Sequence, residues 1–213
     1  MIWVNTAGRR FVNEASHNCA LSFTETDPAT NRPRSLPAHA VGDAQYRHHY
    51  PLAGAAPEDP VPDWVQQADT LAGLAAAVGV DVDGLVSTIA TFNQAVSAGH
   101  DAKFDGGSSA YDRYLGDAET PHPSLGTIEE PPFFAMPVLP GLVGTRGGPC
   151  TDVNGQVLDW DGQPITGLFA AGSAADSVIG PGILSSQMTL GLALTWGWLA
   201  GTTAAVSSPG TVG

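Results

Sequence analysis

The segment that most constrains the fold of this 213-residue chain is GLFAAGSAADSVIGPGILSSQMTLGLALTWGWLAG, at residues 167–201. Its apolar start predicts a buried strand, Leu168 to Ala171, which ends at Gly172 and leads into a glycine-rich loop. A helix should follow from about Gln187 to Val206, and because it is apolar on nearly every face we expect it to be central. The free N–H groups and the dipole at its start favour a ligand with partial negative charge.

Two interpretations of this strand, loop and helix stay open. The segment can hold the edge of an isoalloxazine ring, because the N1–C2=O edge of a flavin becomes anionic on reduction and suits the start of a helix. The alternative is a strand, a loop and a core helix that bind no ligand. Both interpretations predict the same local fold.

A short hairpin should open the chain. The apolar stretches on either side of a glycine turn at residues 6–8 predict two strands, in which Trp3 and Val4 pair with Phe11 and Val12. Such a hairpin would place the polar residues that follow it at one end of a small sheet.

Two helices are predicted in the middle of the chain, at residues 68–78 and 81–98. Asp81 can cap the second helix. The stretches at residues 20–62 and 99–141 are rich in proline, glycine and polar residues, so they should be mostly irregular, with one more ordered patch at residues 40–51. The second helix has an apolar stripe made of Leu85, Ile89, Phe92 and Val96.

The composition excludes several classes of partner. With 21 acidic and 8 basic side chains the net charge is −13, which repels phosphate backbones and anionic membranes, so we expect no nucleic acid and no membrane partner. The most apolar stretch, Met188 to Ala200, is too short to span a bilayer, which predicts a soluble, cytoplasmic protein. Cys19 and Cys150 lie far apart and show no metal-binding spacing.

Several motifs occur in the order in which one flavoprotein family has them. WVNTAGRRFVNE at residues 3–14 resembles the family's VNxxGxRFxNE, and GDAQYRHHYP at 42–51 resembles its FDxxYRxRYP. PPFFAMPVLPGLVGTRGGPCTD at 131–152 resembles the run that leads to its TxGG turn, and residues 167–201 resemble its last flavin-binding stretch. On these motifs the chain resembles the C-terminal portion of the FAD-binding fumarate reductase/succinate dehydrogenase flavoprotein and 3-ketosteroid Δ1-dehydrogenase superfamily.

The resemblance implies FAD as the cofactor and no metal. In that family the flavin is reached by the TxGG turn, here at residues 145–148, and by the strand, loop and helix near the C-terminus. Ser173 stands where many relatives have a glutamate that binds the ribityl hydroxyls, and a serine would make a weaker contact there. The implied cofactor-binding residues are Thr145, Gly147, Gly148, Gly172, Ser173, Ser186, Gln187, Met188 and Thr189.

The chain departs from the residues that carry both known activities of the family. The proton-delivering arginine of fumarate reductases corresponds to Asn18, and a carboxylate-clamping arginine corresponds to about Leu184. Bidentate carboxylate binding needs guanidinium donors, so fumarate and succinate are not expected substrates. Steroid dehydrogenases have a tyrosine at about Asn18, and a tyrosine and a glycine where this chain has Ile183 and Gln187. Without those polar residues, the sequence predicts a pocket beside the flavin with a mainly apolar lining.

His17, Asn18 and Tyr114 are the candidate catalytic residues. Imidazole side chains titrate near neutral pH, so His17 is the nearest group that could take a proton while hydride moves to flavin N5. The alternative for His17 is a solvent-exposed or core-bonded histidine without a catalytic role. Tyr111 or Tyr114 could approach the site from another loop.

No GxGxxG motif follows a strand in this sequence, although the family binds the pyrophosphate of FAD with such a unit. A fragment, a truncated gene and a second chain that carries the GxGxxG half are the three explanations. The expected fold class is α+β, a partial α/β flavoprotein without the N-terminal Rossmann unit. Residues 1–140 should form the substrate-side (cap) region and residues 141–213 the C-terminal part of the FAD-binding domain.

Together these features predict part of an FAD-dependent oxidoreductase. It would be a dehydrogenase or reductase that acts on a carbon–carbon bond beside a carbonyl in an apolar, ketosteroid-like small molecule, and it should be inactive alone. The alternative is a non-catalytic fragment or a scaffold subunit of a split flavoenzyme.

Overall fold

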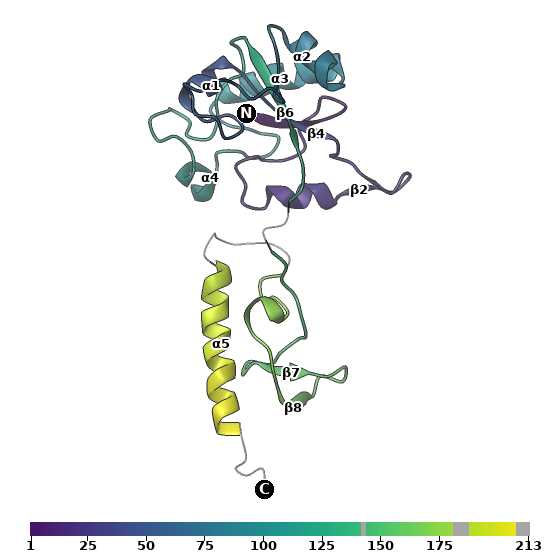
Figure 1. Cartoon of the computed structure of the whole chain (residues 1–213), viewed down its shortest axis with the longest axis vertical. Helices are drawn as coiled ribbons and strands as arrows, with labels where there is room; N and C mark the ends of the chain where they lie inside the picture. Colours follow the sequence, from purple (N-terminus) through teal and green to yellow (C-terminus); the bar gives the residue numbers. More distant parts are fainter. Residues whose placement is uncertain (142–143, 181–187, 208–213) are drawn as a thin grey trace. The chain divides into compact units, whose positions relative to one another are not determined.

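The computed structural model describes residues 1–141, 144–180 and 188–207, which form two compact units, Met1–Pro140 and Gly141–Gly213. Each unit is described by itself (Figure 1). Helices and strands occur in both units, as the expected mixed class requires. That the second unit belongs to an FAD-binding domain without its Rossmann half stays a prediction at this point.

An antiparallel sheet forms the centre of the first unit. Its strands follow the order β1-β4-β6-β5. Ile2 pairs with Val41, and Val41 in turn pairs with Ala135, so β4 and β6 lie inside the sheet. The strands are β1 (Ile2–Asn5), β4 (Ala38–Gly42), β5 (Gln66–Ala68) and β6 (Phe133–Val138).

The predicted hairpin pairing of Trp3 and Val4 with Phe11 and Val12 is wrong. The turn forms, since Asn5 N donates to Arg9 O at 3.1 Å, but Val4 makes only an isolated bridge with Arg10 before the chain leaves the sheet. The Glu14 carboxylate accepts the N–H of Trp3 at 2.8 Å, so a side chain occupies the edge that a second strand would need. β1 pairs with β4 instead.

The two predicted helices are confirmed, with α2 at Leu71–Val78 and α3 at Val82–Ser97. The side chain of Asp81 accepts the N–H of Gly84 at 2.7 Å and caps α3 as expected. α2 packs on β5 and β6. The apolar core beside this sheet contains the predicted stripe of Leu85, Ile89, Phe92 and Val96.

The stretches predicted to be irregular hold more structure than expected. They contain β4 and β6, which pair with strands far away in the sequence. The patch at residues 40–51, predicted to be more ordered, holds α1, which Asp43 caps through Tyr46 N at 3.2 Å. β6 contains Pro137, but β5 pairs with β6 only as far as Ala135. The proline therefore lies where β6 has no hydrogen-bonded partner strand on that side. The short elements are η1 (Cys19–Thr24), β2 (Thr26–Asp27), β3 (Arg32–Pro33), α1 (Ala44–His49) and α4 (Ala110–Tyr114).

The second unit is a hairpin with a long helix beside it (Figure 1). β7 (Gln156–Leu158) and β8 (Pro164–Phe169) pair antiparallel, and η2 (Gly172–Ala174) connects β8 toward α5 (Met188–Ser207). The helix forms as predicted. The buried strand does not, because β8 has one hydrogen-bonded neighbour and Leu168 stays 47% exposed.

The faces of α5 are also not covered as a central helix would be. Among its described residues only Ala200 is buried, whereas Leu190, Leu194 and Trp198 are 64%, 66% and 68% exposed. The expectation that this helix is central is therefore not met within the described part of the chain. A helix that is apolar on all sides and exposed on most of them presents a surface suited to burial.

Candidate functional site

The predicted flavin-binding segments meet in the second unit. Gly147 N donates to Ser173 O at 3.1 Å, and Asp176 N donates to Pro149 O at 3.0 Å, so the turn at residues 145–148 is joined to η2. A Cβ added to Gly148 would lie 2.1 Å from Ala174 O, which leaves no room for any side chain. The close backbone approach depends on glycine at this position.

Gly172 brings β8 and α5 together at the other side of this junction. Its φ of +63° lies in the left-handed region that favours glycine. A Cβ at this residue would lie 3.2 Å from the Cβ of Ala193, so the turn is also pressed against α5. The strand therefore ends in a bare backbone turn at the side of the helix, as the sequence predicts.

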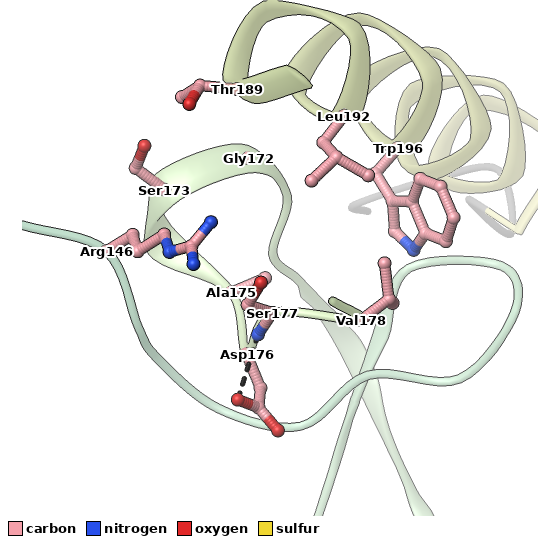
Figure 2. A pocket seen from close by; sticks show the side chains of 10 residues that line it. All are labelled: Arg146, Gly172, Ser173, Ala175, Asp176, Ser177, Val178, Thr189, Leu192 and Trp196. Carbon is pink, nitrogen blue, oxygen red and sulfur yellow. Dashed lines mark hydrogen bonds between the residues drawn. The ribbon is translucent and has the colours of Figure 1, made fainter. Parts of the chain in front are cut away.

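A small pocket, with a volume of about 30 Å³, lies at this junction (Figure 2). That volume holds about one water molecule. Figure 2 shows Leu192 and Trp196 entering from α5, opposite the polar side chains of Ser173 and Arg146. Arg146 Nη2 donates to Gly180 O at 2.9 Å, which ties the turn to the start of the glycine-rich loop.

Most of the cofactor-binding residues inferred from the resemblance are placed at this junction. Gly172, Ser173 and Thr189 line the small pocket. Thr145, Gly147 and Gly148 form the exposed turn, and Met188 is the first residue of α5. Ser186 and Gln187 lie outside the described residues, as do Ile183 and Leu184, on which the departures from the family partly depend.

The described residues fit the edge of a flavin. The turn offers exposed glycine backbone without side chains, and the Ser173 hydroxyl is exposed beside it. The same residues do not enclose a ligand, because the pocket between them is far smaller than the several hundred Å³ typical of a cofactor site. The junction can therefore supply one wall of such a site.

Cys150 lies beside this junction and contacts Asp176. Its Sγ lies 3.4 Å from Asp176 Oδ2, and this hydrogen bond to a carboxylate raises the pKa of the Cys150 thiol. The thiol form is thereby favoured over the reactive thiolate. Cys19 and Cys150 are both free cysteines.

A much larger cavity, of about 1000 Å³, lies in the first unit. Its size matches the upper end of small-molecule sites. Its wall includes His17 and Tyr111, whose rings meet edge to face with centroids 4.9 Å apart. A hydrogen bond joins His17 Nδ1 to the Tyr111 hydroxyl. The cavity thus presents one histidine and one tyrosine as a bonded pair.

Buried polar contacts hold this pair in place. Asn13 Nδ2 donates to Asp112 Oδ2 at 2.9 Å, which ties the segment before His17 to α4, where Tyr111 lies. Glu14 forms a 2.6 Å ion pair with Arg10, and both side chains are largely buried. The segments that carry His17 and Tyr111 are therefore held in place by these other polar contacts.

The carboxyl groups in the cavity wall are mostly engaged. Asp43 is almost fully buried and accepts hydrogen bonds from the backbone N–H groups of Tyr46, Glu129 and Glu130. The Tyr50 hydroxyl donates a hydrogen bond to Asp117 Oδ2 at 2.5 Å. This hydrogen bond raises the pKa of Tyr50 to about 12 and lowers the pKa of Asp117. Asp43 and Asp117 are therefore hydrogen-bonded parts of the wall and not free general bases.

The other two candidate catalytic residues do not line this cavity. Tyr114 is 81% exposed, at the end of α4. Asn18 is half-buried at the start of η1, where its carbonyl accepts the N–H of Leu21 at 2.9 Å. Of the tyrosines that could approach from another loop, Tyr111 is the one that meets His17. No sequence signal marks that choice, because His17 and Tyr111 lie 94 positions apart in the sequence.

No helix in the described ranges is long and apolar enough to cross a membrane. The same part of the chain holds no group of three or more histidine, cysteine or acidic side chains that could bind a metal ion.

Comparisons with known proteins agree on one family. A family model described as an FAD binding domain matches residues 1–184. The 4-oxocyclohexanecarboxylate 2-dehydrogenase of Sinomonas cyclohexanicum is 41% identical over 98% of this chain and 37% of its own length. The 3-oxosteroid 1-dehydrogenase of Mycobacterium tuberculosis is 39% identical over 93% of this chain and 37% of its own length.

A solved structure shows the same likeness. The 3-ketosteroid Δ1-dehydrogenase of Sterolibacterium denitrificans, in complex with 1,4-androstadiene-3,17-dione, has a TM-score of 0.86 and 36% identity, and the match covers 97% of this chain and 39% of that one. The chain thus spans little more than a third of the length of the relatives it matches. The chain belongs to the FAD binding domain family, whose cofactor is FAD, and its relatives in that family include ketosteroid dehydrogenases.

Proposed function

We propose that this chain is part of an FAD-dependent dehydrogenase or reductase that acts on a carbon–carbon bond beside a carbonyl, in a small apolar ketone. The observation that carries this proposal is the junction of the glycine turn, η2 and α5, where Gly148 leaves room for backbone contact only. The names of the similar enzymes, a 4-oxocyclohexanecarboxylate dehydrogenase and 3-oxosteroid dehydrogenases, support a ketone as the substrate class.

The second unit would hold the flavin edge. Gly147 and Gly148 would approach the ring with their backbone, Ser173 would bind a ribityl hydroxyl, and Thr189 would lie at the start of α5 near the pyrimidine edge. The dipole of α5 would favour the negative charge that develops on the reduced ring. FAD, when bound, supplies the hydride chemistry at its N5 atom.

The first unit would supply the substrate side. Its cavity of about 1000 Å³ is large enough for a compact ketone, and His17 lies in its wall, hydrogen-bonded to Tyr111. Asn18 and Tyr114 stay proposals for contacts with the substrate. The described cavity wall contains no lysine or arginine, which agrees with a substrate that is not a dicarboxylate.

A second polypeptide segment with the GxGxxG half would complete the cofactor site. The exposed apolar side chains of α5, among them Leu190, Leu194 and Trp198, support this proposal because a surface of this kind is stable only when it is covered. The proposal holds for one longer polypeptide and for a two-chain assembly alike, and in both cases we expect residues 1–213 alone to be inactive.

The visible spectrum tests the cofactor requirement. We expect the purified chain alone to retain no stoichiometric FAD, because its own pocket holds about one water molecule. Mixing it with the part of the Sinomonas cyclohexanicum 4-oxocyclohexanecarboxylate 2-dehydrogenase that this chain does not match should give a yellow complex. A stoichiometric flavin band in the chain by itself would contradict the need for this second segment.

The alternative is a non-catalytic fragment or a scaffold subunit of a split flavoenzyme. The observation that favours it is Asn18, which stands where steroid dehydrogenases have a catalytic tyrosine. This alternative predicts a yellow complex whose flavin no ketone can reduce. The proposed function predicts reduction by at least one ketone.

A further inference from the structure

We infer that His17 and Tyr111 form the proton-transfer pair of the first unit, and that Ser124 binds the carbonyl oxygen of the ketone beside it. The inference rests on the proposed function, because it assigns the groups that would handle the α-proton of that substrate. It concerns only the cavity of the first unit and therefore needs no knowledge of where the flavin lies.

The first observation is the bonded pair itself. His17 and Tyr111 both line the cavity, and the Tyr111 hydroxyl is hydrogen-bonded to His17 Nδ1. With the hydroxyl as donor, the neutral imidazole carries its own proton on Nε2. The Tyr111 oxygen keeps lone pairs that can accept a proton from a ligand in the cavity while its own proton passes to the imidazole.

The second observation is an unpaired hydroxyl in the same wall. The Oγ atom of Ser124 is buried and has no hydrogen-bond partner among the described residues. A buried hydroxyl without a partner is energetically unfavourable, so its presence calls for an acceptor. A ketone carbonyl is such an acceptor, and the polarised carbonyl would make its α-proton more acidic.

Ser124 lines the same cavity as the pair and lies close to a loop that is bonded to α4. A Cβ built on Gly107 would lie 3.3 Å from Ser124 Oγ, and the N–H of Gly107 donates to Asp112 at 3.1 Å. Asp112 is the neighbour of Tyr111 on α4. One buried carboxylate therefore anchors both the loop that touches Ser124 and the helix that carries Tyr111.

Three other acidic groups of the wall already hold hydrogen-bond donors. Asp112 accepts from Asn13, Gly107 and Ser109, Asp117 accepts from Tyr50, and Glu14 is paired with Arg10.

The proposed step is an enolisation that needs no oxidant. The α-C–H bond of the ketone breaks, its proton forms an O–H bond at Tyr111, and the original Tyr111 proton forms an N–H bond at His17 Nδ1. The electron pair stays on the ketone as an enolate, whose oxygen accepts the hydrogen bond from Ser124. The reverse step with a deuteron returns a ketone labelled at the α-carbon.

Hydrogen exchange tests the step without flavin. The purified chain is incubated with 4-oxocyclohexanecarboxylate in D2O, and the loss of the α-proton signals is followed by NMR against buffer alone. We expect exchange faster than in buffer, and a loss of about 100-fold or more of this acceleration in Tyr111→Phe and in His17→Gln, within the range of general acid–base catalysis. Ser124→Ala should also lose most of it.

Two controls separate catalysis from folding. His100→Gln changes an exposed histidine outside the cavity and should exchange at the wild-type rate. The double variant of His17 and Tyr111 should be no slower than either single variant, because groups that act as a unit are not additive. Circular dichroism on each variant checks that the fold is kept.

Three outcomes would overturn the inference. They are no exchange above buffer in the wild-type chain, folded His17 and Tyr111 variants that keep the wild-type rate, or additive losses in the double variant. Exchange in a chain that never supports flavin reduction would contradict the proposed function and leave the proton-transfer pair intact.

Discussion

At the scale of single residues, the contact between Tyr50 and Asp117 gives the clearest electrostatic signature. The hydroxyl donates to the carboxylate at 2.5 Å, and this raises the pKa of Tyr50 to about 12. Since the neutral phenol is favoured in the folded state, the contribution to stability is present below the ordinary tyrosine range and is lost as the pH rises through about 12. The lowered pKa of Asp117 gives a second contribution, which is lost as the pH falls through that lowered value.

A spectroscopic titration of the tyrosines checks this contact. We expect the phenolate absorbance of the wild-type chain to show one group that ionises near pH 12, and Asp117→Asn to move it toward the ordinary value of about 10. Glu58→Gln, at an exposed carboxyl away from Tyr50, should leave the curve unchanged. Identical curves for wild type and Asp117→Asn would show that the hydrogen bond does not exist in solution.

At the scale of elements, local signals were sufficient where both the cap and the apolar stripe lie within one segment. Asp81 and the stripe that begins at Leu85 predicted α3 correctly for this reason. β4 and β6 were not predicted, because each is defined by a partner strand tens of residues away and β6 is interrupted by Pro137. The hairpin pairing failed for a related reason, since Glu14 takes the N–H of Trp3 that the second strand needed.

The candidate sites likewise divide into residues that the sequence indicates and residues that depend on long-range contacts. The flavin-edge residues follow from a resemblance, and the structure brings Gly147, Gly148 and Ser173 together at one junction. Tyr111 could not be chosen over Tyr114 from the sequence, because the choice depends on the Asn13–Asp112 hydrogen bond between distant segments. Long-range side-chain contacts leave no periodic pattern in a single sequence.

A substitution at the glycine turn tests the junction of the second unit. Gly148→Ala would place a Cβ 2.1 Å from Ala174 O, so we expect a loss of about 1–3 kcal/mol in the free energy of unfolding of this unit, as for other overpacked sites. The yellow two-chain complex should also retain less FAD. Gly144→Ala is the matched control, because a Cβ there meets nothing within 4 Å. Equal urea-unfolding midpoints and equal FAD content in the two variants would contradict the close approach at Gly148.

At the scale of the whole molecule, the two units carry complementary parts of one proposed activity. The first has a large cavity with a histidine–tyrosine pair, and the second has an exposed glycine turn beside an apolar helix. Neither has a complete cofactor site among its described residues. We therefore expect the chain, once joined by a GxGxxG half, to pass hydride between a ketone and FAD.

Anaerobic reduction of the two-chain complex measures that claim most directly. The yellow complex is mixed with 4-oxocyclohexanecarboxylate and, separately, with a 3-oxosteroid, while the flavin spectrum is recorded. We predict that at least one ketone bleaches the oxidised flavin band, with formation of the corresponding α,β-unsaturated ketone in equal amount. A complex that binds FAD but keeps its oxidised spectrum with both ketones would contradict the proposed oxidoreductase and favour a non-catalytic subunit.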